Sequence, residues 1–441
     1  MIRRMAPLLT CGLLLSGCGL GDLWFGESDE EPLPGERISI MAFDRAIEQD
    51  PGVSELEVVL PPPSVNENWT QVGGAPSHAM SHLALGDPLK VQWRADVGEG
   101  SDDDQRLLAQ PLVVGNRVFT MDSRSIVTAY DAERGKQIWR VDLESDDERA
   151  GFFGGGIAYE SGRLFVTTGF AKVFALDAAN GEVLWSQRLP APMRAAPAAS
   201  GGRVFAVTID NQVHALAAED GSRLWRHGGI EEVANLVGGA SPAVEGSAVI
   251  VPYSSGEIFS LLAENGRVLW SDALSAVNRV DPIADLAHIR GEPVIDRGLV
   301  LAVSHSGLMV AIDLRSGARA WDVEFGGVQM PWVAGDFVYL VTKEAQVVCL
   351  TRRDGRVRWV ASLPRYEDPE DLEDPIQWFG PVLAGGRLIL AGSHGEAVSL
   401  SPYNGEELGP IELPGAPAVA PVVAGNTLYF LTEGAELVAL R

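Results

Sequence analysis

The chain has few cysteines for its length. Three of its 441 residues are cysteine, namely Cys11, Cys18 and Cys349. If an N-terminal leader is removed, Cys349 is the only thiol left in the body, and no internal disulfide framework is possible. A lone cysteine in an apolar setting behaves as a small hydrophobic residue, so we interpret Cys349 as a buried structural thiol.

Basic residues are also scarce. There are 34 Lys and Arg against 60 Asp and Glu, which gives a formal net charge of −26. Binding to nucleic-acid phosphates relies on Lys and Arg, so this balance argues against a nucleic-acid partner. It is typical of a soluble surface that repels anionic matter.

The sequence has no N-terminal apolar run long enough to cross a membrane as a helix. Arg3 and Arg4 precede the apolar stretch from Leu8 to Leu15, which falls short of the roughly 20 residues that a span requires. Leu15-Ser16-Gly17-Cys18 follows and resembles the lipobox of bacterial lipoproteins. We therefore expect residues 1–17 to be a signal peptide and Cys18 to be lipidated, with the chain anchored to the outer membrane and facing the periplasm.

Signatures of catalysis are missing as well. There is no Cys-x-x-Cys-His, no adjacent cysteine pair in the body, no Gly-x-Ser-x-Gly and no phosphate-binding loop. His78 and His82 lie four residues apart, but their surroundings, GAPSHAMSHLALG, indicate a loop without helical geometry. We expect no catalytic residue, no metal and no cofactor.

Residues 18–67 are acidic and interrupted by proline, which is typical of a tether, and we expect the folded body to span residues 68–441. A second acidic stretch, Tyr366 to Pro375, is open to two interpretations. It is either a site for a cation or a partner, or a solvated loop, and it lacks the ligand spacing of a calcium loop.

One phrase recurs along this body: a small residue, a turn, a glycine, and a tryptophan four residues after the glycine. Alternating strands flank each turn, with about four strands per copy and no helical pattern between copies. The indole can fill the gap between neighbouring sheets by lying across a small residue of the next sheet. The docking tryptophans are Trp139, Trp185, Trp225, Trp270, Trp321 and Trp359, whereas in the seventh copy Leu408 stands one residue short of that position.

An eighth copy is divided between the two ends of the chain. The sequence stops after Glu436–Leu440, where a last strand is still missing, and Leu89–Trp93 carries that strand together with Trp93. Pairing the two segments closes a ring and removes exposed sheet edges. We therefore predict an all-β protein, an eight-bladed β-propeller closed by its N- and C-terminal strands.

The phrase Ala-x-Asp-x-x-x-Gly-x-x-x-Trp resembles the tryptophan-docking motif of quinoprotein-like propellers. With the lipobox, the eight copies and Asn68-Trp69-Thr70-Gln71-Val72-Gly73-Gly74, the chain is similar to the BamB family of PQQ-like repeat lipoproteins, in its alphaproteobacterial form. The resemblance implies a non-catalytic scaffold that binds the periplasmic domains of a BamA-like barrel protein and other subunits of the β-barrel assembly machinery, and thereby aids insertion of outer-membrane proteins.

Two motifs of that family's partner surface align poorly here. One falls on residues 234–238, where Leu236 matches but the family's arginine is Val237. The other falls on residues 288–290, where both acidic residues are absent and Arg290 stands in the last position. The resemblance makes Leu236 and Arg290 candidate partner-binding residues, and ordinary loop residues are the alternative. Two other functions remain open: a propeller lipoprotein for a different envelope partner, and a PQQ-dependent dehydrogenase.

Overall fold

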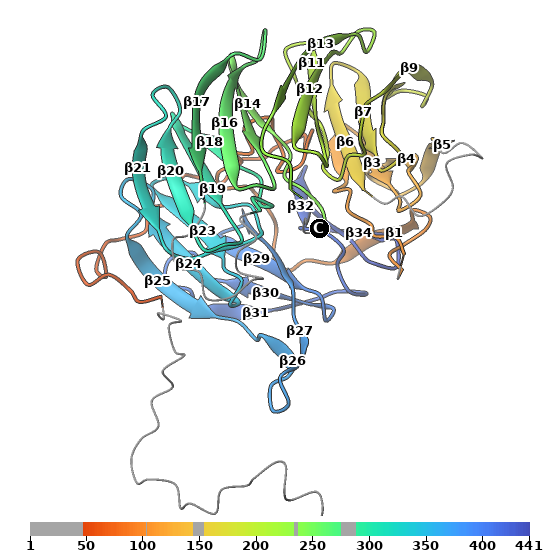
Figure 1. Ribbon diagram of the computed structural model, residues 1–441. Coiled ribbons are helices and arrows are strands. Elements are labelled where there is room, and N and C mark those ends of the chain that lie inside the picture. Colours follow the sequence, from red (N-terminus) through yellow and green to blue (C-terminus); the bar gives the residue numbers. More distant parts are fainter. Residues whose placement is uncertain (1–46, 103, 144–153, 233–236, 275–287) are drawn as a thin grey trace, which may run out of the picture. The chain divides into compact units, whose positions relative to one another are not determined.

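The computed structural model describes residues 47–102, 104–143, 154–232, 237–274 and 288–441, and Ile47–Arg441 form one compact unit (Figure 1). Within these ranges every regular element is a β-strand. The described residues contain no helix that is long and apolar enough to span a membrane.

Eight four-stranded antiparallel sheets are arranged around a central axis, as predicted (Figure 1). We number these sheets as blades 1 to 8. Blades 1 to 4 consist of β2 (Leu112–Val114), β3 (Arg117–Met121), β4 (Ile126–Asp131) and β5 (Gln137–Asp142); β6 (Gly155–Glu160), β7 (Arg163–Thr168), β8 (Lys172–Asp177) and β9 (Val183–Arg188); β10 (Ala198–Ser200), β11 (Arg203–Thr208), β12 (Gln212–Ala217) and β13 (Arg223–Gly228); and β14 (Ala243–Glu245), β15 (Ala248–Pro252), β16 (Glu257–Leu262) and β17 (Val268–Ala273).

The remaining blades repeat this pattern. Blades 5 to 8 consist of β18 (Val294–Asp296), β19 (Leu299–Val303), β20 (Met309–Asp313) and β21 (Arg319–Val323); β22 (Trp332–Ala334), β23 (Phe337–Val341), β24 (Gln346–Thr351) and β25 (Val357–Ser362); β28 (Trp378–Ala384), β29 (Arg387–Gly392), β30 (Glu396–Leu400) and β31 (Glu407–Glu412); and β32 (Val422–Ala424), β33 (Thr427–Leu431), β34 (Glu436–Leu440) and β1 (Val91–Asp96). A separate hairpin, β26 (Tyr366–Asp368) with β27 (Glu373–Pro375), lies between blades 6 and 7.

The two ends of the propeller meet in blade 8. Strand β1 pairs with β34 in antiparallel register, with Trp93 opposite Ala439 and Asp96 opposite Glu436. Backbone hydrogen bonds between Lys90 and Arg441, at 3.0 and 2.9 Å, extend the pairing beyond the strands. The predicted closure by N- and C-terminal strands is confirmed.

Each docking tryptophan links its blade to the next one around the ring. Its indole nitrogen donates a hydrogen bond of 2.8 to 3.3 Å to a backbone carbonyl in the next blade's motif turn. Its ring lies against that turn's glycine, where an added Cβ would come within 2.4 to 2.7 Å of a tryptophan carbon. The pairs are Trp93 with Gly135, Trp139 with Gly181, Trp185 with Gly221, Trp225 with Gly266, Trp270 with Gly317, Trp321 with Gly355, and Trp359 with Gly405.

The position of the small residue differs from the expectation. It is the cross-strand neighbour of the tryptophan within the same blade, as Ala129 is for Trp139 and Cys349 is for Trp359. The surface on which the indole lies in the next blade is the motif glycine, because a glycine has no side chain to keep the ring away. Cys349 itself is fully buried, as predicted.

Blade 7 is the exception among these links. Gly409 is paired with Ser399, in the register that tryptophan occupies in the other blades, while Leu408 beside it is exposed. Blade 8 has no motif glycine to receive an indole, because two separate segments, β34 and β1, form its outer half. The absence of a motif tryptophan in blade 7 therefore matches the absence of its docking surface in blade 8.

A segment without regular strands fills the centre of the ring. We call residues 64–85 the hub segment. It forms hydrogen bonds to all eight blades in their order around the axis, starting from blade 8 and ending at blade 7. The bonds join Asn66 to Val423 and Gly425, Trp69 to Val113, Thr70 to Tyr159, Gln71 to Ala199, Pro76 to Val244, Ser77 to Ile295, Ser81 to Trp332, and Leu83 to Leu383 and Gly385.

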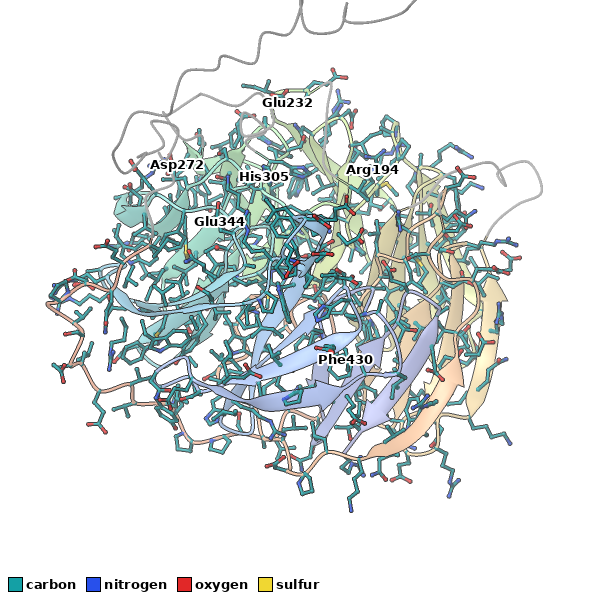
Figure 2. All side chains as sticks on the ribbon, turned by 90° about the horizontal axis from the view of Figure 1, so that it is seen from below. Arg194, Glu232, Asp272, His305, Glu344 and Phe430 are labelled. Atoms are coloured by element: carbon teal, nitrogen blue, oxygen red, sulfur yellow. The ribbon has the colours of Figure 1, made fainter. Side chains whose placement is uncertain are left out.

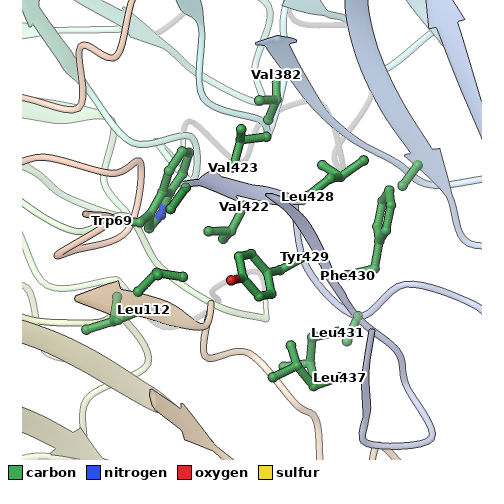
Figure 3. Packing of buried hydrophobic residues seen from close by; sticks show 14 of the residues in the cluster. Trp69, Leu112, Val382, Val422, Val423, Leu428, Tyr429, Phe430, Leu431 and Leu437 are labelled. Atoms are coloured by element: carbon green, nitrogen blue, oxygen red, sulfur yellow. The ribbon is translucent and has the colours of Figure 1, made fainter. Parts of the chain in front are cut away.

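The hub segment also contributes to the apolar core. Trp69 is fully buried and belongs to the largest core cluster, where it lies beside Leu112, Val422 and Val423 (Figure 3). Its indole nitrogen donates a 3.0 Å hydrogen bond to the side-chain oxygen of Gln110. The hub segment is therefore part of the folded propeller.

The two histidines of this segment are held in place as well. His78 Nδ1 lies 2.7 Å from the carbonyl oxygen of Pro293, and His82 Nδ1 lies 2.7 Å from that of Pro61. His82 Nε2 accepts a 3.0 Å hydrogen bond from the backbone of Gly386. The loop has a fixed geometry, contrary to the interpretation from sequence, because its polar groups bond to distant strands.

The compact unit begins earlier than the predicted boundary at residue 68. Residues 47–63, which we call the arm, lie on blade 6: Asp50 forms a 2.7 Å ion pair with Arg356, and Arg358 Nε donates a 2.6 Å hydrogen bond to the Leu56 carbonyl. The Arg356 guanidinium holds the pKa of Asp50 below its usual range. Val58 is buried. Acidic and apolar residues of the expected tether thus find partners on the propeller surface. Residues 1–46, including the predicted lipidation site Cys18, lie outside the described residues.

Candidate functional site at the mouth of the central channel

The central channel has one filled end and one open end. The first strand of each blade runs from the inter-blade connection toward the turn that leads to the second strand, and the hub segment bonds near the latter turns, for example at Gly385 and Gly425. The opposite end is surrounded by the inter-blade connections. We call this end the mouth.

A cavity of about 120 Å³ occupies the mouth. Its floor includes Trp69 and Gly73 of the hub segment. Its walls are formed by the connections that precede the first strand of each blade, which we call the inner strand. A second cavity of about 40 Å³ lies between blades 3 and 4. The two cavities share Arg194, Ala195, Gly238 and Gly239 in their linings.

Charged side chains gather on one side of this mouth, on blades 3 to 5. Arg194 precedes β10, and His288, Arg290 and Glu292 precede β18. Figure 2 shows Arg194 and His305 on this side of the ring, away from Phe430 of blade 8. The apolar part of the cavity lining includes Met330, Trp332 and Phe379.

Arg290 is placed at the cavity wall by a glycine. A Cβ added at Gly238 would lie 3.3 Å from Arg290 Nε, and Gly238 has a φ of +88°, a conformation that residues with side chains rarely adopt. Burial lowers the pKa of Arg290, while the neighbouring Glu292 raises it. The guanidinium thus lies in a partly desolvated position beside the Gly238 backbone.

Burial acts on the two neighbours of Arg290 as well. It raises the pKa of Glu292 to about 7, although the nearby Arg290 opposes that shift. It lowers the pKa of His288 to about 4, and Arg290, His305 and Arg194 lower it further. At neutral pH His288 is therefore uncharged, Glu292 is partly protonated, and Arg290 carries a positive charge.

The candidate residues named from sequence have different places. Arg290 lines the mouth cavity. Leu236 lies outside the described residues, but its neighbour Val237 is 46% exposed. The acidic stretch forms the exposed hairpin β26–β27, with Leu372 at 64% exposure.

Sequence reasoning missed Glu292, Arg194 and the hub segment as parts of this site. A signal for Glu292 was present: it stands two residues after Arg290 and directly before Pro293, the residue that precedes strand β18 of blade 5. Arg194 and the hub segment have no comparable signal, because only the closed ring brings them to the cavity.

Fold and site together define a class: a quinoprotein-like propeller with tryptophan docking whose channel is filled at one end by its own N-terminal residues. Comparison with known proteins specifies the family. A family model described as outer membrane protein assembly factor BamB matches residues 87–148 and 123–361. The chain belongs to the BamB family.

Individual relatives agree with this assignment. The chain is 25% identical over 361 residues to the outer membrane protein assembly factor BamB of Moranella endobia, covering 80% of this chain and 90% of the relative. It is 30% identical over 307 residues to that of Salmonella typhimurium, covering 69% and 76%. An uncharacterised protein of Rickettsia prowazekii is 29% identical over 261 residues, covering 58% of this chain and 63% of the relative.

Solved structures share the fold. The crystal structure of BamB from Moraxella catarrhalis aligns with a TM-score of 0.67 at 21% identity, covering 80% of this chain and 99% of that one. Quinohemoprotein alcohol dehydrogenase from Comamonas testosteroni aligns with a TM-score of 0.63 at 14% identity, covering 86% and 80%. Both are similar in fold, and neither likeness by itself assigns an activity.

Proposed function

We propose that this chain is a non-catalytic lipoprotein of the outer-membrane β-barrel assembly machinery. In this proposal Cys18 is lipidated and holds the propeller at the periplasmic face of the outer membrane. The mouth side of the propeller binds the periplasmic domains of a BamA-like barrel protein. Family membership is the observation that carries the proposal, because the related proteins are outer membrane protein assembly factors.

The difference between the two ends of the channel supports the mouth side as the face that binds the partner. The arm and the hub segment occupy one end, and they continue toward Cys18 in the sequence. The mouth is the end that these residues leave open, and it carries Arg290 and the exposed Val237 next to Leu236. A partner can therefore approach the mouth without displacing the N-terminal residues.

The size of the mouth cavity supports a non-catalytic role. Cofactor and ligand sites usually enclose about 300–1,000 Å³, mostly from one concave pocket. The cavity here is about 120 Å³, and Trp69 of the hub segment forms part of its floor. Addition of PQQ and calcium tests the dehydrogenase alternative, which a bound chromophore would favour.

The direct test is affinity purification of the full-length protein from detergent-solubilised outer membrane. We expect a barrel protein with repeated periplasmic domains to copurify, and a Cys18→Ala variant to lose incorporation of labelled palmitate. Charge or polarity reversal at Leu236 and Arg290 should reduce that capture. Unchanged capture would remove both residues from the interface, and capture of other envelope proteins alone would favour the alternative partner.

A further inference from the structure

Arg290 carries a positive charge for which the surrounding protein supplies no direct partner. No hydrogen bond or ion pair joins its guanidinium to another residue in the described parts of the chain, although Glu292 lies close enough to affect it electrostatically. The side chain lines the mouth cavity and is neither fully buried nor fully exposed. The arginines that do form ion pairs in the described parts of the chain lie outside the lining of this cavity.

An anionic hydrogen-bond acceptor would stabilise a guanidinium in this position. Arg has five N–H donors and no acceptor, and its planar fork matches a carboxylate by two parallel hydrogen bonds. Removing a charge from water without a partner is costly, so a complementary anion is favoured where the solvent is restricted. Bound water can accept hydrogen bonds from the guanidinium, and a carboxylate can accept them and also neutralise its charge.

The size and lining of the cavity favour an amino-acid side chain as the bound group. A volume of about 120 Å³ holds several groups the size of water, since one such group needs about 10–15 Å³. Met330, Trp332 and Phe379 supply apolar surface to the same cavity, which suits the methylene groups of an aspartate or glutamate. A single carboxylate also balances the single charge of Arg290.

Glu292 complements this arrangement when it carries a proton. A protonated carboxyl group donates one hydrogen bond and can do so to a second carboxylate at its side. Because burial favours its protonated form near neutral pH, Glu292 opposes an incoming carboxylate less than an exposed glutamate would. The remaining surface is strongly acidic, with a net charge of −26 for the whole chain, and repels acidic segments elsewhere.

We infer that the mouth is a receptor for one acidic side chain on an exposed loop of the barrel-protein partner, with Arg290 binding its carboxylate in bidentate geometry beside Glu292. The inference rests on the proposed function, which it deepens by naming the contact chemistry. It makes Arg290 a specificity-determining residue of the interface. Arg290→Lys retains the charge but loses the fork, so binding should fall between that of the wild type and that of Arg290→Gln.

The test uses the full-length protein and the purified barrel protein in detergent. Arg290→Gln should weaken their affinity at least about 10-fold, as expected when one member of a desolvated charge pair is removed. Arg297→Gln is the matched control: Arg297 belongs to the same blade, in the turn between β18 and β19 at the other end of the channel. We expect its affinity to equal that of the wild type.

Binding of a labelled peptide tests the contact chemistry independently of the proposed function. N-acetylated tetraglutamate should bind the wild type in fluorescence anisotropy, bind Arg290→Gln at least about 10-fold more weakly, and compete with the barrel protein, whereas tetraglutamine should not bind. Equal affinity of the wild type and Arg290→Gln for the barrel protein would overturn the inference. Failure of the wild type to bind the barrel protein, with specific tetraglutamate binding intact, would instead contradict the proposed function alone.

Discussion

Trp69 and Trp332 stack at the centre of the ring, with their ring centroids 6.4 Å apart and their planes inclined by 21°. Trp69 belongs to the hub segment and Trp332 to the inner strand of blade 6, and Trp332 Nε1 donates a 2.7 Å hydrogen bond to the Ser81 carbonyl. Both side chains are almost completely buried. The pair joins the N-terminal residues to the blades by packing as well as by hydrogen bonding.

Trp69→Ala should therefore destabilise the whole propeller. Large-to-small substitutions of buried aromatic residues usually cost about 3–5 kcal/mol, and this one also removes one of the two hydrogen bonds that Gln110 Oε1 accepts, the other coming from the Gly73 backbone. Urea unfolding followed by intrinsic fluorescence measures the loss. Leu56→Ala, at a 44% exposed position of the arm, is the control and should cost less than about 0.5 kcal/mol. Equal stabilities of the two variants would show that the hub segment is not integral to the fold.

Alanine substitutions at two glycines of blade 5 distinguish the cost of backbone strain from the cost of losing tryptophan docking. Gly317 and Gly298 have similar φ values, +73° and +78°, so alanine strains the backbone similarly at both. An added Cβ at Gly317 would lie 2.5 Å from Trp270, whereas at Gly298 it would meet open space. Gly317→Ala should cost about 1–3 kcal/mol more than Gly298→Ala in thermal or urea unfolding. Equal losses would mean that the indole does not depend on that glycine.

Cys349 should be chemically inert in the folded protein. It is fully buried beside Tyr339 and Trp359, and burial raises the pKa of its thiol far above neutrality. A thiol reagent applied to a variant lacking Cys11 and Cys18 should react only after denaturation. Cys349→Ala should cost less than about 1.5 kcal/mol, because alanine already occupies this position in most blades. Rapid labelling of the native protein would contradict the structural assignment.

The protonation of Glu292 predicts a pH-dependent stability. The pKa of Glu292 rises from 4.5 in the unfolded chain to about 7 in the folded protein because of burial, with Arg290 opposing the shift. Below pH 4.5 the carboxyl is protonated in both states, so it has no differential effect. As pH rises from 4.5 to 7 the unfolded state loses the proton first, which destabilises the folded state.

Glu292→Gln should consequently raise the melting temperature at about pH 8, by about 1–3 °C, and leave it unchanged near pH 4.5. Arg290 stays charged over this range, and His288, with a pKa of about 4, stays neutral above pH 5. Differential scanning calorimetry of both proteins at the two pH values is the measurement. An equal shift at both values would attribute it to packing rather than to proton binding.

The repeat made most of the fold predictable from sequence. The glycine and tryptophan of each copy are local features, and a count of copies from Trp93 to Ala439 is sufficient for eight blades and for the pairing of β1 with β34. Even the missing tryptophan of blade 7 was visible. The error about the small residue arose because sequence alone does not distinguish the cross-strand neighbour from the neighbour in the next blade.

The hub segment and the mouth were not predictable in the same way. The residues from Ser64 to Leu85 show no strand periodicity, and their partners are distributed over almost the entire chain, from Val113 to Gly425. Arg290 was named through a family resemblance, whereas Arg194 and Glu292 acquire their setting only when blades 3 and 5 close around the cavity. Long-range burial decides the chemistry of such groups, and a linear sequence does not record it.

In the proposed function, the mouth end of the propeller binds the barrel protein, while the end covered by the arm does not. Photocrosslinking in intact cells tests it, with p-benzoylphenylalanine placed at Val237 beside the mouth or at Val59 on the arm, positions that are 46% and 65% exposed. We expect an adduct with the barrel protein from position 237 and none from position 59. An adduct from position 59 alone would contradict it.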